Sequence, residues 1–119
     1  MVKTEQLVDT ITRAIQEKKG EDIAIIDLRK TDGAIASYFI ICRGNSPILV
    51  SAIAESIGDM ARIELSEKPA HVNGLDTCQW VAIDYVDVIV HIFMPEMRDY
   101  YNLEDLWQDA PTKMVPNLD

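Results

Sequence analysis

Asp84, Asp87 and His91 lie close together in the sequence and form its best candidate for a reactive cluster. Two carboxylates and an imidazole can bind a divalent metal or transfer protons. The spacing disfavours a shared metal ion, because Asp87 and His91 would lie about 13 Å apart along a β-strand. We therefore interpret His91 as a hydrogen-bonded surface histidine and predict no metal site.

A second candidate is the turn Gly44–Asn45–Ser46, which could hold a phosphate at the start of the helix that follows it. The turn lacks the second glycine and the lysine of a P-loop. Nucleotidyl transfer would also need two carboxylates separated by one residue, whereas the sequence has Asp87, Val88 and Ile89. A small nucleotide- or metal-dependent enzyme stays open as the alternative function, and no cofactor or catalytic residue is predicted.

The aspartates and the histidine belong to residues 79–93, QWVAIDYVDVIVHIF, which we interpret as a β-hairpin. With Tyr85 and Val86 at the tip, Asp84 faces Asp87, and Trp80 faces His91. The alternation predicts one aliphatic face, formed by Val81, Ile83, Val88, Val90 and Ile92. It predicts a second face that carries Trp80, Asp84, Asp87, His91 and Phe93.

The second face predicts a binding surface. Facing aspartates would destabilise the sheet unless a cation lay between them, and Trp80 beside them suits an Arg or Lys of a partner. Alternatively, Trp80 is half-buried beneath the C-terminal helix. The sequence alone leaves both interpretations open.

The remaining sequence predicts helices and strands that position this hairpin. Strands are expected at residues 22–29, 37–43 and 71–72. Helices are expected at residues 4–19 with Gly20 as the C-cap, from Pro47 with Ser46 as its cap to a point before Pro69, at residues 95–101, and after Asn102. The sequence thus predicts an α/β fold of the α+β type, with a mixed sheet of about five strands and helices mainly on the aliphatic face. We expect one domain at residues 1–110 and a loose tail at 111–119.

Composition narrows the class of partner. The 119 residues carry a net charge of −9, which disfavours direct nucleic-acid contact and favours a basic protein partner. There is no apolar run that could span a membrane and no signal peptide, so we expect a cytoplasmic protein. Cys42 and Cys78 are expected to be buried thiols.

Several uncommon motifs occur in an order that resembles the ribosomal silencing factor family, also called Iojap-like. They are DIAIIDLR, ASYFIICRGNS, HVNGL, WVAIDYVDVIVHIF and RDYYNLEDLW, and together they cover nearly the whole chain. The resemblance implies a nucleotidyltransferase-like superfold without catalytic residues. It also implies a non-enzymatic repressor of translation that binds the large ribosomal subunit through one protein, the fourteenth of that subunit, and sterically blocks joining with the small subunit.

The resemblance also implies which residues bind the partner. Carried over by position, these are Trp80, Asp84, Tyr85, Asp87, His91, Arg98, Tyr101, Glu104 and Trp107. Two positions depart from the family pattern: Val86 replaces a usual glycine, and Ser37 replaces a common aspartate. Some members of the family are dimers when free, so a homodimer is a further expectation.

Overall fold

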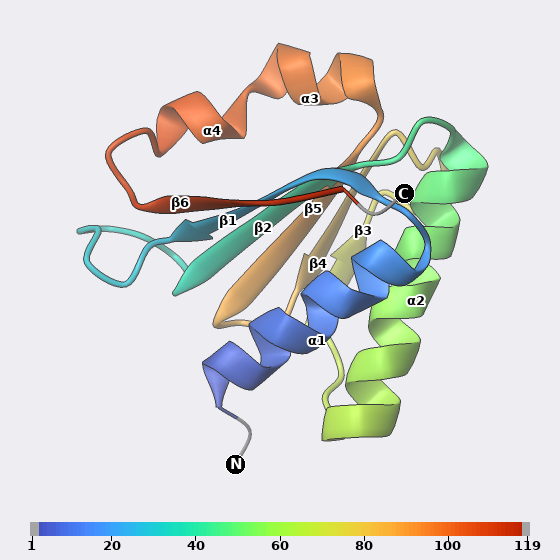
Figure 1. Ribbon diagram of the computed structural model, residues 1–119, viewed down its shortest axis with the longest axis horizontal. Helices are drawn as coiled ribbons and strands as arrows, with labels where there is room; N and C mark the ends of the chain where they lie inside the picture. Colours follow the sequence, from blue (N-terminus) through green and yellow to red (C-terminus); the bar gives the residue numbers. More distant parts are fainter. Residues whose placement is uncertain (1–2, 118–119) are drawn as a thin grey trace.

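A computed structural model describes residues 3–117, which form a six-stranded sheet with helices on both faces (Figure 1). The strands are β1 (Glu21–Asp27), β2 (Tyr38–Arg43), β3 (His71–Asn73), β4 (Trp80–Asp84), β5 (Val88–Phe93) and β6 (Thr112–Val115). The helices are α1 (Thr4–Glu17), α2 (Pro47–Leu65), α3 (Pro95–Tyr101) and α4 (Leu103–Leu106). The strand order is β3-β4-β5-β2-β1-β6, in which β2 and β5 are parallel and the other neighbours antiparallel. The predicted α+β class is confirmed.

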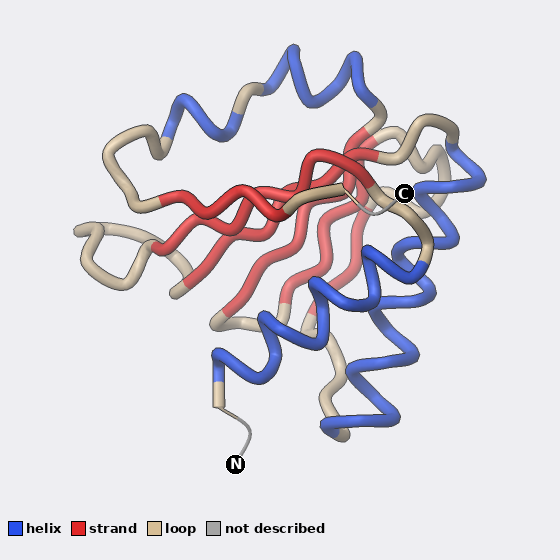
Figure 2. The backbone as a smooth tube through the Cα atoms, viewed as in Figure 1, coloured by secondary structure: helices blue, strands red, loops and turns tan. Residues whose placement is uncertain are grey.

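The long helices α1 and α2 pack side by side on the aliphatic face of the sheet (Figures 1 and 2). Apolar residues at helical spacing in α1, such as Ile11 and Ile15, are fully buried there with Ile53 and Ile57 of α2. Arg13 joins the two helices through a 2.6 Å ion pair with Glu64. This layer is the main hydrophobic core.

The ends of these helices follow from local chemistry. The Ser46 hydroxyl accepts a hydrogen bond from the Leu49 N–H at 3.1 Å and caps α2, as predicted. The predicted C-cap glycine of α1 is wrong, because Lys19 rather than Gly20 takes the left-handed conformation, with φ 58°. Gly20 is needed for close packing instead, since a Cβ there would lie 2.5 Å from Cγ2 of Ile15.

A second, smaller core lies on the opposite face of the sheet, beneath α3 and α4 (Figure 1). Its buried members are mostly apolar: Ala24, Ile26, Leu28, Phe39, Ile41, Ile89, Phe93 and Ala110. The face that is predicted to carry Asp84, Asp87 and His91 is therefore mostly apolar, and only a few of its side chains are polar. The two long helices lie on the aliphatic face, as predicted, and only the short helices α3 and α4 cover the other face.

The predicted loose tail is wrong for residues 112–115, which form β6 and pair with β1 in an antiparallel register. This strand raises the number of strands to six and closes the β1 edge of the sheet. Residues 118–119 of the predicted tail lie outside the described residues. Both cysteines are buried and free, as expected. No helix within residues 3–117 is long and apolar enough to cross a bilayer.

Candidate functional site

The candidate site is built on the hairpin formed by β4 and β5, whose register differs from the prediction by two residues. Asp84 pairs with Ile89 and Trp80 pairs with Phe93, so the predicted facing of Asp84 and Asp87 is wrong. The tip consists of Val86 and Asp87, because the Tyr85 N–H donates to the Val88 carbonyl at 2.8 Å. A shift by an even number of residues leaves the faces unchanged, and Trp80, Ala82, Asp84, Ile89, His91 and Phe93 share one face as predicted.

The hairpin tip is a tight and strained turn. Val86 has φ 76°, and the Asp87 N–H donates to the Tyr85 carbonyl at 3.0 Å. This is the geometry of a γ-turn with a positive φ, which is rare for a β-branched residue. Two contacts stabilise it: Asp84 Oδ1 accepts from the Val86 N–H at 2.7 Å, and the Asp87 carbonyl accepts the N–H groups of residues 37 and 38.

An aromatic cluster occupies the hairpin face at the end opposite the tip. The Trp80 ring stacks on Phe93 at a centroid distance of 5.0 Å and lies 4.4 Å from the ring of Tyr101 in α3. Its indole Nε1–H donates to His91 Nδ1 at 3.1 Å. Trp80 is therefore half-buried beneath the C-terminal helices, which is the second of the two sequence interpretations.

His91 is buried, not a surface residue as predicted, with 7% of its surface exposed. Because an indole N–H can only donate, Nδ1 must be the acceptor, and the ring carries its proton on Nε2. Burial lowers the pKa of His91 to about 4, so the ring is neutral at pH 7. Its Nε2 has no hydrogen-bond partner in the part of the chain that the structure describes.

The helices α3 and α4 are attached to the sheet by an arginine and a tryptophan. Arg98 Nη1 donates to the Asp22 carbonyl at 2.6 Å, and its Nε donates to Glu104 at 2.9 Å. Trp107 meets the ring of Phe39 edge-on at a centroid distance of 5.9 Å. Arg98, Glu104 and Trp107, which are predicted to bind the partner, thus also hold the C-terminal helices in place.

One predicted contact residue does not lie on this face. Tyr85 points to the helix layer, where 7% of its surface is exposed and it belongs to the main core. Asp87 and Tyr101 are exposed, whereas Trp80, Asp84, Glu104 and Trp107 are intermediate. We call the surface formed by these six residues the aromatic face.

Two exposed apolar side chains near the aromatic face were not singled out by the sequence. Tyr100 and Leu106 are 81% and 68% exposed in α3 and α4, so these short helices offer apolar side chains to solvent. The signal was present in the run RDYYNLEDLW, which holds more large apolar residues than two short helices can bury. Among residues 3–117, no group of three or more His, Cys, Asp or Glu side chains is placed to hold a metal ion.

Comparison with known proteins identifies the family. The family model described as "Ribosomal silencing factor during starvation" matches residues 2–119. The chain belongs to the ribosomal silencing factor family. The "Ribosomal silencing factor RsfS" of Bacillus subtilis is 44% identical over 98 residues, which cover 82% of this chain and 81% of that protein. The resemblance in the motifs is thereby confirmed.

Two further matches extend the comparison to a solved structure and to a mammal. A crystal structure of a Chromobacterium violaceum protein matches with a TM-score of 0.85 and 27% identity, covering 98% of this chain and 95% of that one. The mouse "Mitochondrial assembly of ribosomal large subunit protein 1" is 26% identical over 106 residues. The match covers 84% of this chain and 44% of the mouse protein, so it spans less than half of that protein.

Proposed function

We propose that this ribosomal silencing factor binds the large ribosomal subunit and sterically blocks its joining with the small subunit. The observation that carries the proposal is the family match across residues 2–119. The name of the mouse relative, which refers to the large ribosomal subunit, supports the choice of subunit. The partner suggested by the family resemblance is the fourteenth protein of that subunit, and the place of action is the cytoplasm.

The aromatic face is our proposed contact surface. Asp87 and Tyr101 are exposed and can meet the partner directly, with Trp80 supporting the Tyr101 ring from below. A face that combines acidic groups with an exposed aromatic ring suits a basic protein surface. His91 and Arg98 are proposed as positioning residues, since they hold Trp80 and the C-terminal helices, and Tyr85 is left out because it is buried on the other face.

We propose that the protein acts by occupancy and without turnover. The residues that could have carried chemistry have structural partners: His91 Nδ1 accepts from Trp80, and Asp84 accepts from the Val86 N–H. A blocker of this kind must be present in proportion to the subunits that it inhibits. A nucleotide- or metal-dependent enzyme would act at lower amounts.

Titration into purified large subunits tests the proposal. Small subunits are added afterwards, and joined ribosomes are measured by sedimentation. We expect inhibition that saturates at about one copy per large subunit, needs no nucleotide and reverses on dilution, as for any saturable single-site binding equilibrium. Cross-linking of the bound protein should identify the partner. Inactivation by substoichiometric amounts that grows with time would contradict the proposal and favour an enzyme.

Two substitutions locate the contact. Tyr101→Ala and Asp87→Lys should each weaken binding to large subunits, by roughly tenfold or more for a central aromatic contact. Glu17→Lys is the matched charge control, because Glu17 is exposed at the end of α1 on the opposite face of the sheet. Equal binding of the Asp87 and Glu17 variants would place the contact elsewhere on the molecule.

A further inference from the structure

An apolar groove lies between the middle of α2 and the outermost strand β3, on the face of the sheet that α1 and α2 cover. Its volume is about 320 Å³. Residues of α2, of β3 and the loops on either side of it, and of the end of β4 line it, among them Ala54, Gly58, Pro69, Val72, Leu75 and Tyr85. It belongs to the face opposite the aromatic face, so the proposed ribosome contact does not cover it.

The walls of this groove present apolar surface to solvent. Val72 and Leu75 line the groove and are 40% and 52% exposed, so they present apolar surface that the rest of the chain does not cover. A Cβ added at Gly58 would meet no atom within 4 Å, so the α2 side of the groove is open. The groove can therefore take an apolar side chain from outside.

Tyr85, which lines the same groove, carries a buried hydroxyl group without a partner in the described part of the chain. Tyr85 lines the groove with only 7% of its surface exposed, and its hydroxyl has no hydrogen-bond partner within residues 3–117. Burial, together with the charge of Glu67, raises the pKa of Tyr85 to about 12, so the hydroxyl keeps its proton. A ligand that displaces the side chains covering this hydroxyl and brings a carbonyl oxygen would satisfy the donor.

The neighbouring strand offers backbone groups of its own. β3 is the last strand of the sheet on this side, and all three of its residues are exposed. An unpaired strand edge is a template on which an extended peptide can add a further strand. Because β3 is short, such pairing would position a peptide and leave most of its affinity to the groove.

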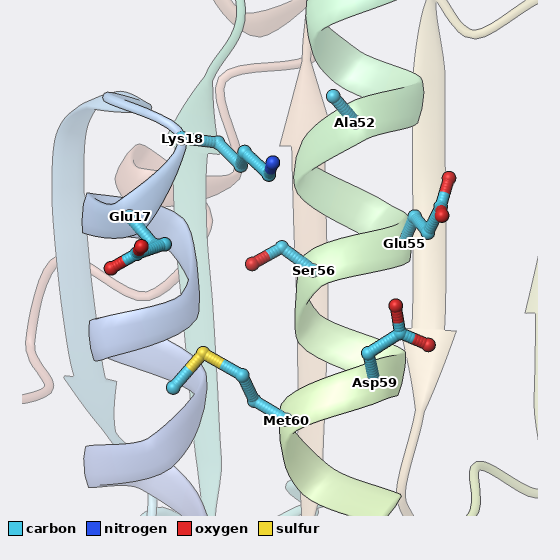
Figure 3. A pocket seen from close by; sticks show the side chains of 7 residues that line it. All are labelled: Glu17, Lys18, Ala52, Glu55, Ser56, Asp59 and Met60. Carbon is cyan, nitrogen blue, oxygen red and sulfur yellow. The ribbon is translucent and has the colours of Figure 1, made fainter.

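Acidic groups surround the groove and indicate the charge of the ligand. Glu55 lines it, and Glu67 lies close enough to Tyr85 to act on its hydroxyl. A separate hollow of about 470 Å³ lies between α1 and α2. In the close view of this hollow in Figure 3, Glu55 and Asp59 lie on the side of α2 that is turned away from α1. A second copy of the chain, with its net charge of −9, is a poor match for this rim.

We propose that this groove is a second docking site, which takes an extended segment of a basic partner protein. The segment pairs with β3, places one large apolar side chain between Gly58 and Val72, and positions a Lys or Arg beside Glu55. A backbone carbonyl oxygen of the segment accepts a hydrogen bond from the Tyr85 hydroxyl. This inference is independent of the proposed silencing function, since it uses the other face of the sheet.

Selection from a phage-displayed library of random peptides on the full chain tests the inference. Selected sequences are then synthesised and titrated by calorimetry. We expect enrichment of peptides in which a large apolar residue is adjacent to Lys or Arg. Gly58→Leu should weaken their binding by about tenfold or more, because the leucine side chain fills the groove. Leucine also favours the helix more than glycine does, so the variant should fold.

Milder variants separate the individual contacts. Tyr85→Phe removes only the hydroxyl and should weaken binding several-fold, as expected for loss of about one hydrogen bond. Glu55→Gln should weaken the binding of cationic peptides. The matched control Asp32→Asn, in an exposed loop outside the groove, should bind these peptides as the wild-type chain does.

Four results would overturn the inference. They are the absence of any enriched peptide, peptides that bind the Gly58→Leu and wild-type chains equally, apolar peptides that bind as well without Lys or Arg, and dimerisation of the chain that Gly58→Leu abolishes. The last result would identify a second copy as the occupant of the groove.

Discussion

His91 is held neutral by the aromatic rings that surround it. Phe39 lies at a centroid distance of 4.9 Å and Phe93 at 6.0 Å, and the only hydrogen bond of the ring described in residues 3–117 comes from Trp80. Water that would solvate an imidazolium is excluded from this shell. The pKa of His91 is therefore about 4, below its ordinary value of 6.5.

This lowered pKa predicts acid sensitivity. Above pH 6.5, His91 is neutral in both the folded and the unfolded chain and adds no pH dependence. As the pH falls from 6.5 to 4, the unfolded chain binds a proton that the folded chain excludes, so the free energy of unfolding should fall by about 3 kcal/mol. Urea unfolding at a series of pH values measures this loss.

The control for this prediction is His91→Phe, which keeps an aromatic ring and removes the titrating group. Carboxylates paired in the folded chain also lose stability in acid: the Arg29 hydrogen bond lowers the pKa of Asp27, and the Arg13 hydrogen bond lowers the pKa of Glu64. The contribution of His91 is therefore the difference between the wild-type chain and the His91→Phe variant in how the free energy of unfolding depends on pH. An identical pH dependence in the variant would show that His91 is not the group responsible.

Val86 carries strain that a glycine would release. A residue with a Cβ pays about 1–2 kcal/mol in the left-handed region, while glycine loses about 0.5–1 kcal/mol of that gain through its extra freedom when unfolded. Val86 is 63% exposed, so little packing is lost. We expect Val86→Gly to raise the free energy of unfolding by about 1 kcal/mol, measured by urea unfolding.

A second exposed apolar residue provides the comparison. Ile35 is 74% exposed and is not among the described residues with positive φ. Ile35→Gly should therefore leave the free energy of unfolding unchanged or lower it. If Val86→Gly destabilised the chain as much as Ile35→Gly, the strain at the hairpin tip would be negligible.

At the scale of elements, α3 and α4 are held to the sheet by few contacts. Neither helix contains a fully buried residue, and both are too short to be stable alone. Arg98 connects both helices to the start of β1, through Glu104 of α4 and the Asp22 carbonyl. Its side chain is only 11% exposed, so these bonds are largely shielded from water.

Arg98→Ala should therefore loosen this part of the molecule selectively. We expect the free energy of unfolding to fall by about 2 kcal/mol, because charged hydrogen bonds shielded from water are lost. Amide hydrogen exchange should accelerate in α3 and α4 and stay unchanged in α2. Arg62→Ala is the matched control: its ion pair with Asp59 is exposed and should contribute little. Uniformly faster exchange across the chain would refute a local role.

At the scale of the whole molecule, the net charge of −9 governs association. It steers the protein towards basic surfaces, an effect that salt screens. The Debye length shortens from about 10 Å at 0.1 M to about 3 Å at 1 M ionic strength. The association rate with the partner protein identified by cross-linking should fall over this range, while the dissociation rate changes less. A rate independent of salt, measured by stopped-flow mixing, would exclude electrostatic steering.

The sequence alone determined what depends on neighbouring residues. Alternation along residues 79–93 fixed which side chains within each strand share a face, because successive side chains of a strand point to opposite sides. Ser46 and Pro47 fixed the start of α2, because a cap acts within one helical turn. The quoted motifs indicated the family without any coordinates.

Only the tertiary structure decided what depends on residues far apart in the chain. The hairpin register is set where the Asp87 carbonyl binds the N–H groups of residues 37 and 38, and where Tyr85 packs into the main core. The strand β6 forms because β1 offers it a free edge, although its own sequence has no strand pattern. Such pairings bring together segments whose mutual positions no local pattern encodes. The sequence could therefore give the faces of the hairpin, but neither its register nor the packing of α3 and α4 over it.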